Sequence, residues 1–259
     1  MNDQRTDYIN RFMQPGQPLE RTPLVLIIDI SYSMEAIRAI LNEAITELLK
    51  QMKGKELLRG SIDLLVIHFN GESKEVVDFT PLEDVKASDI TIKECSGCTD
   101  TGTAISTALD KAYAYRDKLY DDTDGYITPN QPLVFLLTDG IPDAGKKRKE
   151  DTDKEYQEAV DAVNQAYEHA AKYIKEKERN KKLVFVAAGI HHNGGFDRDG
   201  KRIPGSNVSK DRLKELTNFP NRVITFDGDK TNFASFCKDI IKGTTLVVAN
   251  EEVNDFALV

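Results

Sequence analysis

The sequence predicts an α/β fold with a doubly wound, mainly parallel central sheet, one antiparallel edge strand and helices on both faces. Short, unbroken apolar runs such as residues 24–28 and 133–137 are typical of strands that are buried on both faces of a parallel sheet. Segments with apolar residues at helical spacing alternate with these runs, as in sheets whose strands are joined by helical crossovers. With 259 residues, the chain is long enough to bury the core of one such domain.

The predicted elements begin with a strand at residues 23–29 and a long helix whose apolar stripe runs from Ile37 to Met52. Two strand-like segments at 61–70 and 74–80 are joined by a short Gly-Glu-Ser turn, which predicts a hairpin with an antiparallel edge strand. The remaining predicted elements are a helix from about 104 to 112, a strand at 133–138, a helix from 156 to 174, a strand at 183–190, a short helix at 208–218, a strand at 222–226 and a helix at 231–243.

We expect three regions along the chain. Residues 1–22 are polar and interrupted by Pro and Gly, which indicates an N-terminal extension. Residues 23–243 form the domain, with a long Gly-, Asp- and Pro-rich loop inserted at 191–207. Residues 244–259 form a C-terminal tail, whose strand-like segment 245–249 either pairs at the sheet edge, docks on a neighbouring chain or remains loose.

The composition indicates an acidic protein of the cytoplasm. A net charge of −8 and a pI of about 5.2 argue against a broad surface for nucleic acid or anionic membranes. The longest apolar runs have the length of strands and are far too short to span a membrane. The first residues include acidic side chains and lack the apolar core of a secretion signal, so we expect a cytoplasmic location.

Three cysteines do not form a disulfide framework in a chain of this length. Cys95 and Cys98 form a C-x-x-C pair, but zinc needs two further ligands, and neither Cys237 nor the pair His191 and His192 has the usual spacing. The remaining interpretations are a redox switch and two small, buried loop thiols, of which we favour the second.

Polar side chains follow the first strand, where the chain leaves the sheet at its carboxyl edge. Asp29, Ser31 and Ser33 form a D-x-S-x-S pattern directly after the apolar residues 24–28. Open α/β sheets bind ligands at this edge. One carboxylate and two hydroxyls supply oxygen ligands only, which suit Mg²⁺ or Mn²⁺ rather than zinc. Asp and Ser are also ordinary N-cap residues before a helix, so this pattern alone leaves both interpretations open.

Two further segments complete a recognisable arrangement. Thr99 lies in a loop of small residues just before a helix, and the second buried strand ends in Thr138, Asp139 and Gly140. A strand-end D-x-S-x-S, a Gly-x-Thr loop and a strand-end Thr-Asp-Gly, in that order, resemble the von Willebrand factor A (vWA) domain. The resemblance extends from about residue 23 to about residue 243.

This resemblance implies a metal-ion-dependent adhesion site with Mg²⁺ or Mn²⁺ as the cofactor. In that family, the two serine positions are direct hydroxyl ligands, the two aspartates hold the ion directly or through water, and the threonine joins according to the conformational state. An Asp or Glu carboxylate of a partner protein fills the open position on the ion. The implied function is therefore non-catalytic protein binding, with the metal held by Asp29, Ser31, Ser33, Thr99 and Asp139.

The cytoplasmic, nearly single-domain architecture is most similar to bacterial vWA proteins of the TerY or YegL type, which are associated with tellurium-resistance and stress-response systems. One alternative is a metal-dependent phosphohydrolase with Asp29 as nucleophile, although Ser31 replaces the second acid of the D-x-D pattern. Another is a structural subunit whose ion is occupied by an acid from its own complex, with Glu251, Glu252 and Asp255 as candidate donors. No P-loop or G-x-S-x-G motif is present.

Two segments are expected to border the metal site. The inserted loop 191–207 follows a parallel strand, so it should rise on the metal-bearing edge, where long loops tend to carry binding residues. The segment 140–147, which includes Asp143, follows the strand that carries Asp139 and is expected to help choose the partner. The basic residues of this loop are candidates for contacts with an acidic partner: Arg198, Lys201 and Arg202. Its acidic residues, Asp197 and Asp199, could equally be turn formers.

Overall fold

The structure of the protein is a computed structural model, which describes residues 19–123, 127–145, 147 and 151–249. Its centre is a sheet of seven strands, six of which are hydrogen-bonded in the order β3-β2-β1-β5-β6-β9, while β4 pairs with β1. These strands are β1 (Leu19–Asp29), β2 (Ile62–Phe69), β3 (Ser73–Pro81), β4 (Ile127–Pro129), β5 (Leu133–Thr138), β6 (Val184–His191) and β9 (Val223–Asp227).

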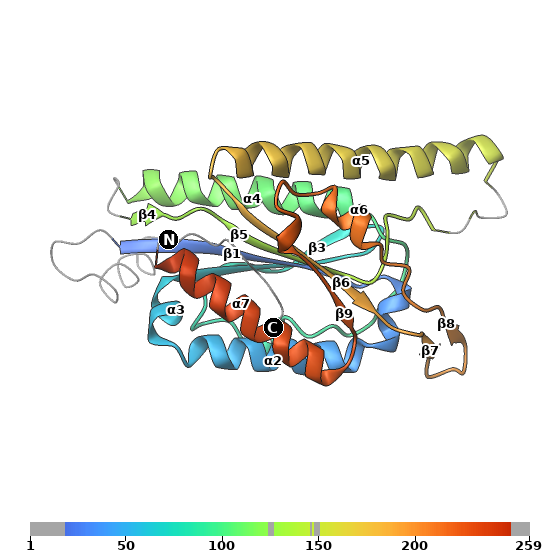
Figure 1. Ribbon diagram of the computed structural model, residues 1–259, viewed down its shortest axis with the longest axis horizontal. Coiled ribbons are helices and arrows are strands. Elements are labelled where there is room, and N and C mark those ends of the chain that lie inside the picture. The colour runs from blue at the N-terminus through green and yellow to red at the C-terminus, as the bar shows by residue number, and fades with distance from the viewer. Residues whose placement is uncertain (1–18, 124–126, 146, 148–150, 250–259) are drawn as a thin grey trace.

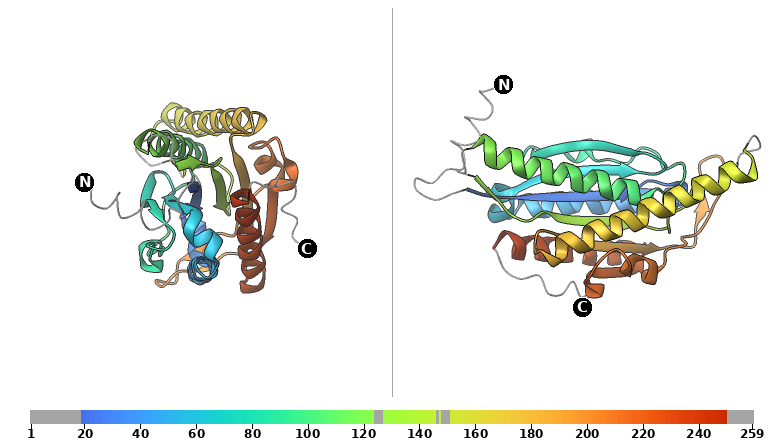
Figure 2. Two further views of the ribbon diagram at one scale, coloured as in Figure 1. Left: turned by 90° about the vertical axis from the view of Figure 1, so that its left-hand side faces the viewer. Right: turned by 90° about the horizontal axis from the view of Figure 1, so that it is seen from above.

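The central strands run in one direction. The pairs β1–β2, β1–β5, β5–β6 and β6–β9 are parallel, whereas β3 is antiparallel to β2 and lies at the edge of the sheet. Helices cover both faces (Figures 1 and 2). This confirms the predicted fold class, and it means that β1, β2, β5, β6 and β9 all end at the same edge of the sheet.

Alternate residues of each central strand face opposite helical layers, as the pleat of a strand requires. In β1, Leu24, Leu26 and Ile28 belong to one core cluster, whereas Val25 and Ile27 belong to the other, and all five are buried. Figure 1 shows two layers of helices: α4 (Thr101–Asp122), α5 (Asp153–Arg179) and α6 (Lys210–Lys214) on one face, and α2 (Arg38–Lys53), α3 (Glu56–Ser61) and α7 (Lys230–Val248) on the other.

Helices α4 and α5 approach each other very closely. Gly102 lies in the first turn of α4, and a Cβ built at this glycine would be 2.2 Å from the backbone of both Ala166 and Tyr167 in α5. No side chain larger than hydrogen fits there, so this glycine sets the distance between the two helices. Helix α5 begins with a capping box in which Thr152 and Glu155 satisfy each other's backbone N–H groups, as the Thr-x-x-Glu pattern requires.

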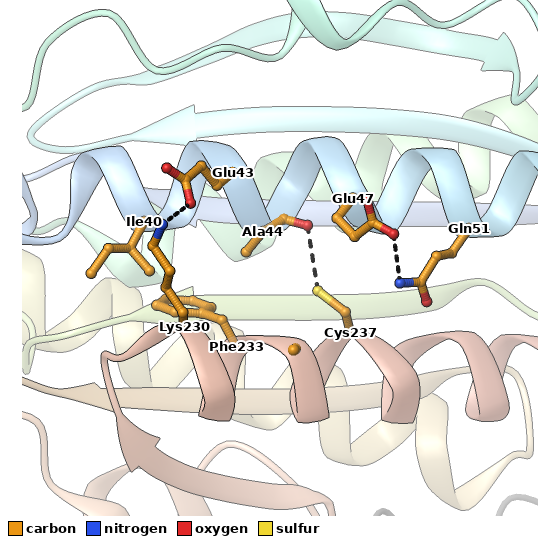
Figure 3. Close-up of a pocket in the computed structure, with 9 residues that line it drawn as sticks. Ile40, Glu43, Ala44, Glu47, Gln51, Lys230, Phe233 and Cys237 are labelled. Carbon is orange, nitrogen blue, oxygen red and sulfur yellow. Dashed lines mark hydrogen bonds and ion pairs between the residues drawn. The ribbon is translucent and has the colours of Figure 1, made fainter.

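On the other face, α2 and α7 lie side by side (Figure 3). The ammonium of Lys230 is 2.6 Å from the carboxylate of Glu43, and the Cys237 thiol donates to the carbonyl of Ala44 at 3.5 Å. A small apolar hollow of about 180 Å³ lies between the two helices. Its lining residues are not shared with the carboxyl edge of the sheet, where the polar motifs gather.

Residues 244–248 belong to helix α7, so the strand expected at 245–249 is wrong. Helix α7 continues to Val248 instead of ending at Gly243. Thr244, Val247 and Val248 are buried and extend the apolar stripe of α7 by one more turn. β-branched residues favour strands on local grounds, but packing against the core overrides that preference here.

Other differences concern boundaries. Strand β1 begins at Leu19 and is lengthened by its pairing with β4, so its first residues lie within the range expected to be an extension. The loop 191–207 contains a short antiparallel hairpin of β7 (Gly195–Phe196) and β8 (Arg202–Ile203). The division into extension, domain and tail stays a prediction. None of the helices in the described part of the chain combines the length and apolar content needed to cross a membrane.

Candidate metal centre

The two strands that carry the predicted aspartates are neighbours in the sheet. In β1 and β5, Ile28 lies beside Leu137, so Asp29 and Thr138 are the residues with which the two strands end. Asp139 follows directly after β5. The sequence pattern that placed both acids at strand ends therefore brings them to one position on the carboxyl edge, as parallel pairing requires.

Both oxygens of Asp29 are hydrogen-bonded. The backbone N–H of Ser31 donates to Oδ1 at 2.7 Å, and the hydroxyl of Thr138 donates to Oδ2 at 2.6 Å. The first bond closes a tight turn at Ser31, immediately before the 3₁₀ turn Tyr32–Ala36, which contains Ser33. The second bond joins the end of β1 to the end of β5.

A chain of hydroxyl groups leads from this turn to the second acid. Ser33 Oγ donates to Asp139 Oδ1 at 2.9 Å, and the Oγ atoms of Ser31 and Ser33 are 3.3 Å apart. Two carboxylates and two hydroxyls from segments more than one hundred residues apart thus converge at one position. Ser31 is buried and Ser33 is half-buried, so the group faces solvent through the serine pair.

The Thr99 loop is attached to both of these segments by backbone hydrogen bonds. Thr99 exchanges two with Asp143, at 3.0 and 2.9 Å, and the loop also bonds to the D-x-S-x-S turn through Ser96 N–H to Ile30 O at 2.8 Å. A Cβ built at Gly140 would lie 3.8 Å from Thr99 Oγ1. Thr99 therefore lies beside the end of β5, at the wall of the same hollow as the two serines.

The two buried carboxylates of this cluster repel each other, which favours a bound cation. Asp29 and Asp139 are both fully buried, and burial raises the pKa of Asp29 to about 7, with repulsion from Asp139 adding to the effect. The hydrogen bonds from Thr138 and Ser31 oppose the rise in this pKa but do not cancel it. A divalent ion beside both carboxylates would relieve this repulsion, and the donor set of carboxylate and hydroxyl oxygens fits a hard ion such as Mg²⁺ or Mn²⁺.

A hollow of about 840 Å³ opens over the cluster. One wall comes from the Thr99 loop and the segment after β5, including Ile141 and Asp143, both of which are exposed. The other wall comes from the inserted loop, with the exposed side chains of Lys201 and Arg202. Both segments that were expected to border the site therefore line it.

Sequence reasoning missed two side chains that touch the acids. Thr138 belongs to the strand-end Thr-Asp-Gly motif but is not among the predicted ligands, and His192 lies at the start of the inserted loop. His192 Nε2 lies 2.6 Å from Asp139 Oδ2, with only 6% of the histidine side chain exposed. The sequence does carry a usable signal for Thr138, because this residue ends the same apolar run that places its neighbour Asp139 at the sheet edge. No local pattern marks His192, since its contact depends on how the inserted loop folds back.

The cysteines follow the favoured interpretation in part. Cys95 is buried, and burial raises its pKa well above the usual range for a thiol. Cys98 is only half-buried, and it lines the hollow beside Thr99. Burial also raises the pKa of the Cys98 thiol, with nearby acids adding to the effect.

The fold and this cluster together define a recognised class of domain. The sequence matches the von Willebrand factor type A domain family over residues 24–234, and the chain belongs to that family. Domains of this family commonly mediate metal-dependent protein binding through a site for a divalent metal, and they are typically non-catalytic adhesion modules. The comparison with curated proteins gave no match.

Solved structures of similar fold come from several sources. Proximal thread matrix protein 1 from the mussel byssus superposes with a TM-score of 0.53 at 17% identity, over 88% of this chain and 49% of that one. The PilB minor pilin from Streptococcus sanguinis superposes with a TM-score of 0.56 at 14% identity, over 89% of this chain and 62% of the pilin. The pilus adhesin SpaC from Lactobacillus rhamnosus GG superposes with a TM-score of 0.56 at 16% identity, over 92% of this chain and 31% of the adhesin.

At these identities the likeness extends to the fold alone. This chain spans about half the length of the mussel protein that it matches. One further structure of the mussel protein, with a TM-score of 0.50 at 16% identity over 88% of this chain and 49% of that one, is described as having a zinc-occupied adhesion-site motif.

Proposed function

We propose that this chain is a non-catalytic, metal-dependent protein-binding domain. In this proposal Asp29, Ser31, Ser33, Thr99 and Asp139 hold one Mg²⁺ or Mn²⁺ ion, and the ion binds an acidic residue of a partner protein. The observation that carries the proposal is the cluster itself. Two fully buried carboxylates, one bound by the Ser31 backbone N–H and the other by the Ser33 hydroxyl, lie with the two serine hydroxyls beneath an open hollow.

Different members of the cluster suit different parts of this role. The serine hydroxyls are neutral and face the hollow, so they suit direct ligation of the ion. The aspartates are fully buried beneath the serine hydroxyls and supply negative charge to the ion. Mg²⁺ favours octahedral coordination and retains water readily, so an ion held by few charged ligands keeps an electrophilic position for a further oxygen. When bound, the ion supplies that Lewis-acidic position.

The hollow favours an acidic partner. A carboxylate bound directly to a divalent ion gains much more than an exposed ion pair, which contributes only about 0–1 kcal/mol. Lys201 and Arg202 add positive charge to one wall, which partly offsets the protein's net charge of −8 close to the ion. Asp143 lies on the opposite wall, so the partner should place its acidic groups toward the inserted loop.

The same geometry argues against the phosphohydrolase alternative. A nucleophilic carboxylate must reach a substrate, but Asp29 is fully buried and both of its oxygens accept hydrogen bonds from within the protein. The group that faces the hollow is the serine pair, and the acids in contact with it, Asp29 and Asp139, are both fully buried. Binding is therefore the function that this site supports best.

The proposal is tested by affinity capture from native cells in Mg²⁺ and in EDTA. We expect a partner that is retained only with metal and is lost from the double variant Ser31→Ala with Ser33→Ala. Ser88→Ala, an exposed serine that does not line the hollow, serves as the matched control and should retain the partner. A partner that survives both EDTA and the double serine variant would contradict the proposal.

The biological setting is a separate part of the proposal. A cytoplasmic role in a bacterial tellurium-resistance or stress-response system depends on the resemblance to TerY- and YegL-like proteins, and the identity of the captured partner tests it. The structural-subunit alternative predicts that another copy of this chain is captured instead. Its candidate donors, Glu251, Glu252 and Asp255, lie outside the described residues.

A further inference from the structure

We propose that His192 is a positioning residue of the metal centre, which fixes the orientation of Asp139 and attaches the inserted loop to the ion site. This inference rests on the proposed function, because it concerns how that same metal is held. It starts from the contact between His192 Nε2 and Asp139 Oδ2 at 2.6 Å, in which the histidine side chain is 6% exposed and the aspartate is fully buried.

The direction of this hydrogen bond follows from the other ring nitrogen. The backbone N–H of Gly194 donates to His192 Nδ1 at 3.1 Å, so Nδ1 is the acceptor. Nε2 then carries the hydrogen and donates it to Asp139. Gly194 is suited to this turn because its φ is +78° and a Cβ there would lie 2.4 Å from the carbonyl oxygen of Ile203. The glycine thus allows the turn that holds the ring in place.

Because of this bond, the two oxygens of the Asp139 carboxylate have different partners. Oδ2 is held by His192, and Oδ1 accepts from the hydroxyl of Ser33. A carboxylate fixed at one oxygen cannot rotate freely, so Oδ1 stays directed toward the serine pair. Groups that orient metal ligands in this way commonly account for about 10- to 100-fold in metal affinity.

Both ends of the inserted loop are attached to the same short segment after β5. At the start of the loop, His192 binds the Asp139 side chain. At its end, the N–H of Asn207 donates to the Asp139 carbonyl at 3.0 Å, and Asn207 Oδ1 accepts from the N–H of Ile141 at 3.1 Å. The loop that forms one wall of the hollow is therefore fixed to the residue that supplies the ion's second carboxylate.

The chain offers a matched control for this idea. His191 is the preceding residue, of the same type, but its side chain is exposed. The test compares His192→Ala and His191→Ala by titration with Mn²⁺, with free Mn²⁺ followed by electron paramagnetic resonance. We expect His192→Ala to weaken Mn²⁺ binding by about 10- to 100-fold and His191→Ala to change it by less than about twofold. His192→Gln keeps a donor near the position of Nε2 and should recover much of the loss.

Unfolding of each variant in EDTA separates positioning from a general structural role. A merely structural histidine would lower stability in EDTA but leave the Mn²⁺ affinity of the folded protein unchanged, and that result would overturn the inference. Where the alanine variant does not fold, His192→Leu takes its place, because leucine keeps most of the side-chain volume but has no hydrogen-bond donor. Equal Mn²⁺ affinity of His192→Leu and His192→Gln would also overturn the inference. If the wild-type protein binds no Mn²⁺, the proposed function fails and this inference fails with it.

Discussion

Replacing Asp29 by Asn should make the metal-free protein more stable at neutral pH while it removes metal binding. The substitution keeps the shape of the side chain but removes a charge that is fully buried beside Asp139. Its hydrogen bonds can be retained. The amide oxygen can accept from Ser31 N–H, and the Thr138 hydroxyl can turn its hydrogen toward the Gly140 carbonyl, 3.3 Å away, and accept from the new NH₂ group.

The magnitude follows from the pKa of Asp29, which burial raises from 3.8 to about 7. The folded protein holds this proton more tightly than the unfolded chain does. Its unfolding free energy therefore falls as pH rises through this interval, by about 1.4 kcal/mol per pH unit, and levels off above it. Between pH 4 and pH 8 the wild-type protein in EDTA should lose about 4 kcal/mol from this group alone. The variant has no such group and should lack this loss.

The assay is urea unfolding of both proteins in EDTA at several values of pH, with the difference between them plotted against pH. We expect the variant to be the more stable protein at pH 8, and the difference to shrink toward pH 4. Saturating Mg²⁺ should stabilise the wild type, by about 2.7 kcal/mol at one hundred times the dissociation constant, and should leave the variant unchanged. Equal pH dependence of the two proteins in EDTA would refute the argument that Asp29 bears a buried charge in need of a cation.

Three further predictions concern packing, a distant ion pair and partner choice. Gly102→Ala should lower the unfolding free energy by at least about 2 kcal/mol in urea unfolding, because no room exists for a Cβ between α4 and α5. Arg21→Ala should cost about 3–5 kcal/mol by removing one half of a fully buried ion pair with Asp63. Mn²⁺ affinity should not change, since Arg21 lies roughly 26 Å along β1 from the site. Replacing Lys201 and Arg202 by Gln should lower the affinity for the captured partner by roughly three- to tenfold. In binding assays, this affinity should also depend less on salt, and Mn²⁺ affinity should be unchanged.

The fold was predictable because its signals are local and repeated. The apolar runs of β1 and β5 identify strands buried on two faces, and the hairpin of β2 and β3 has a short turn between two strand-like segments. Alternation of strands and helices then leaves few topologies. Strand β4 was not foreseen, because it is only three residues long and exists through its pairing with the start of β1.

The outline of the site was predictable for a related reason. Asp29 and Asp139 each follow an apolar strand, and parallel neighbours end at the same edge, so sequence position gives spatial position. His192 was not predictable in this way. It contacts Asp139 because the loop 191–207 folds back along the sheet edge, and that path depends on hydrogen bonds such as those of Asn207 with Asp139 and Ile141. Such long-range contacts leave no periodic pattern in the chain.

The most direct test of a metal centre at this edge is anomalous diffraction from crystals grown with Mn²⁺. We expect one strong peak at the floor of the hollow, at roughly 2.1 Å from Ser31 Oγ and Ser33 Oγ, with the carboxylates of Asp29 and Asp139 beneath it. A peak bound elsewhere, or none at this position when Mn²⁺ is saturating, would contradict the account.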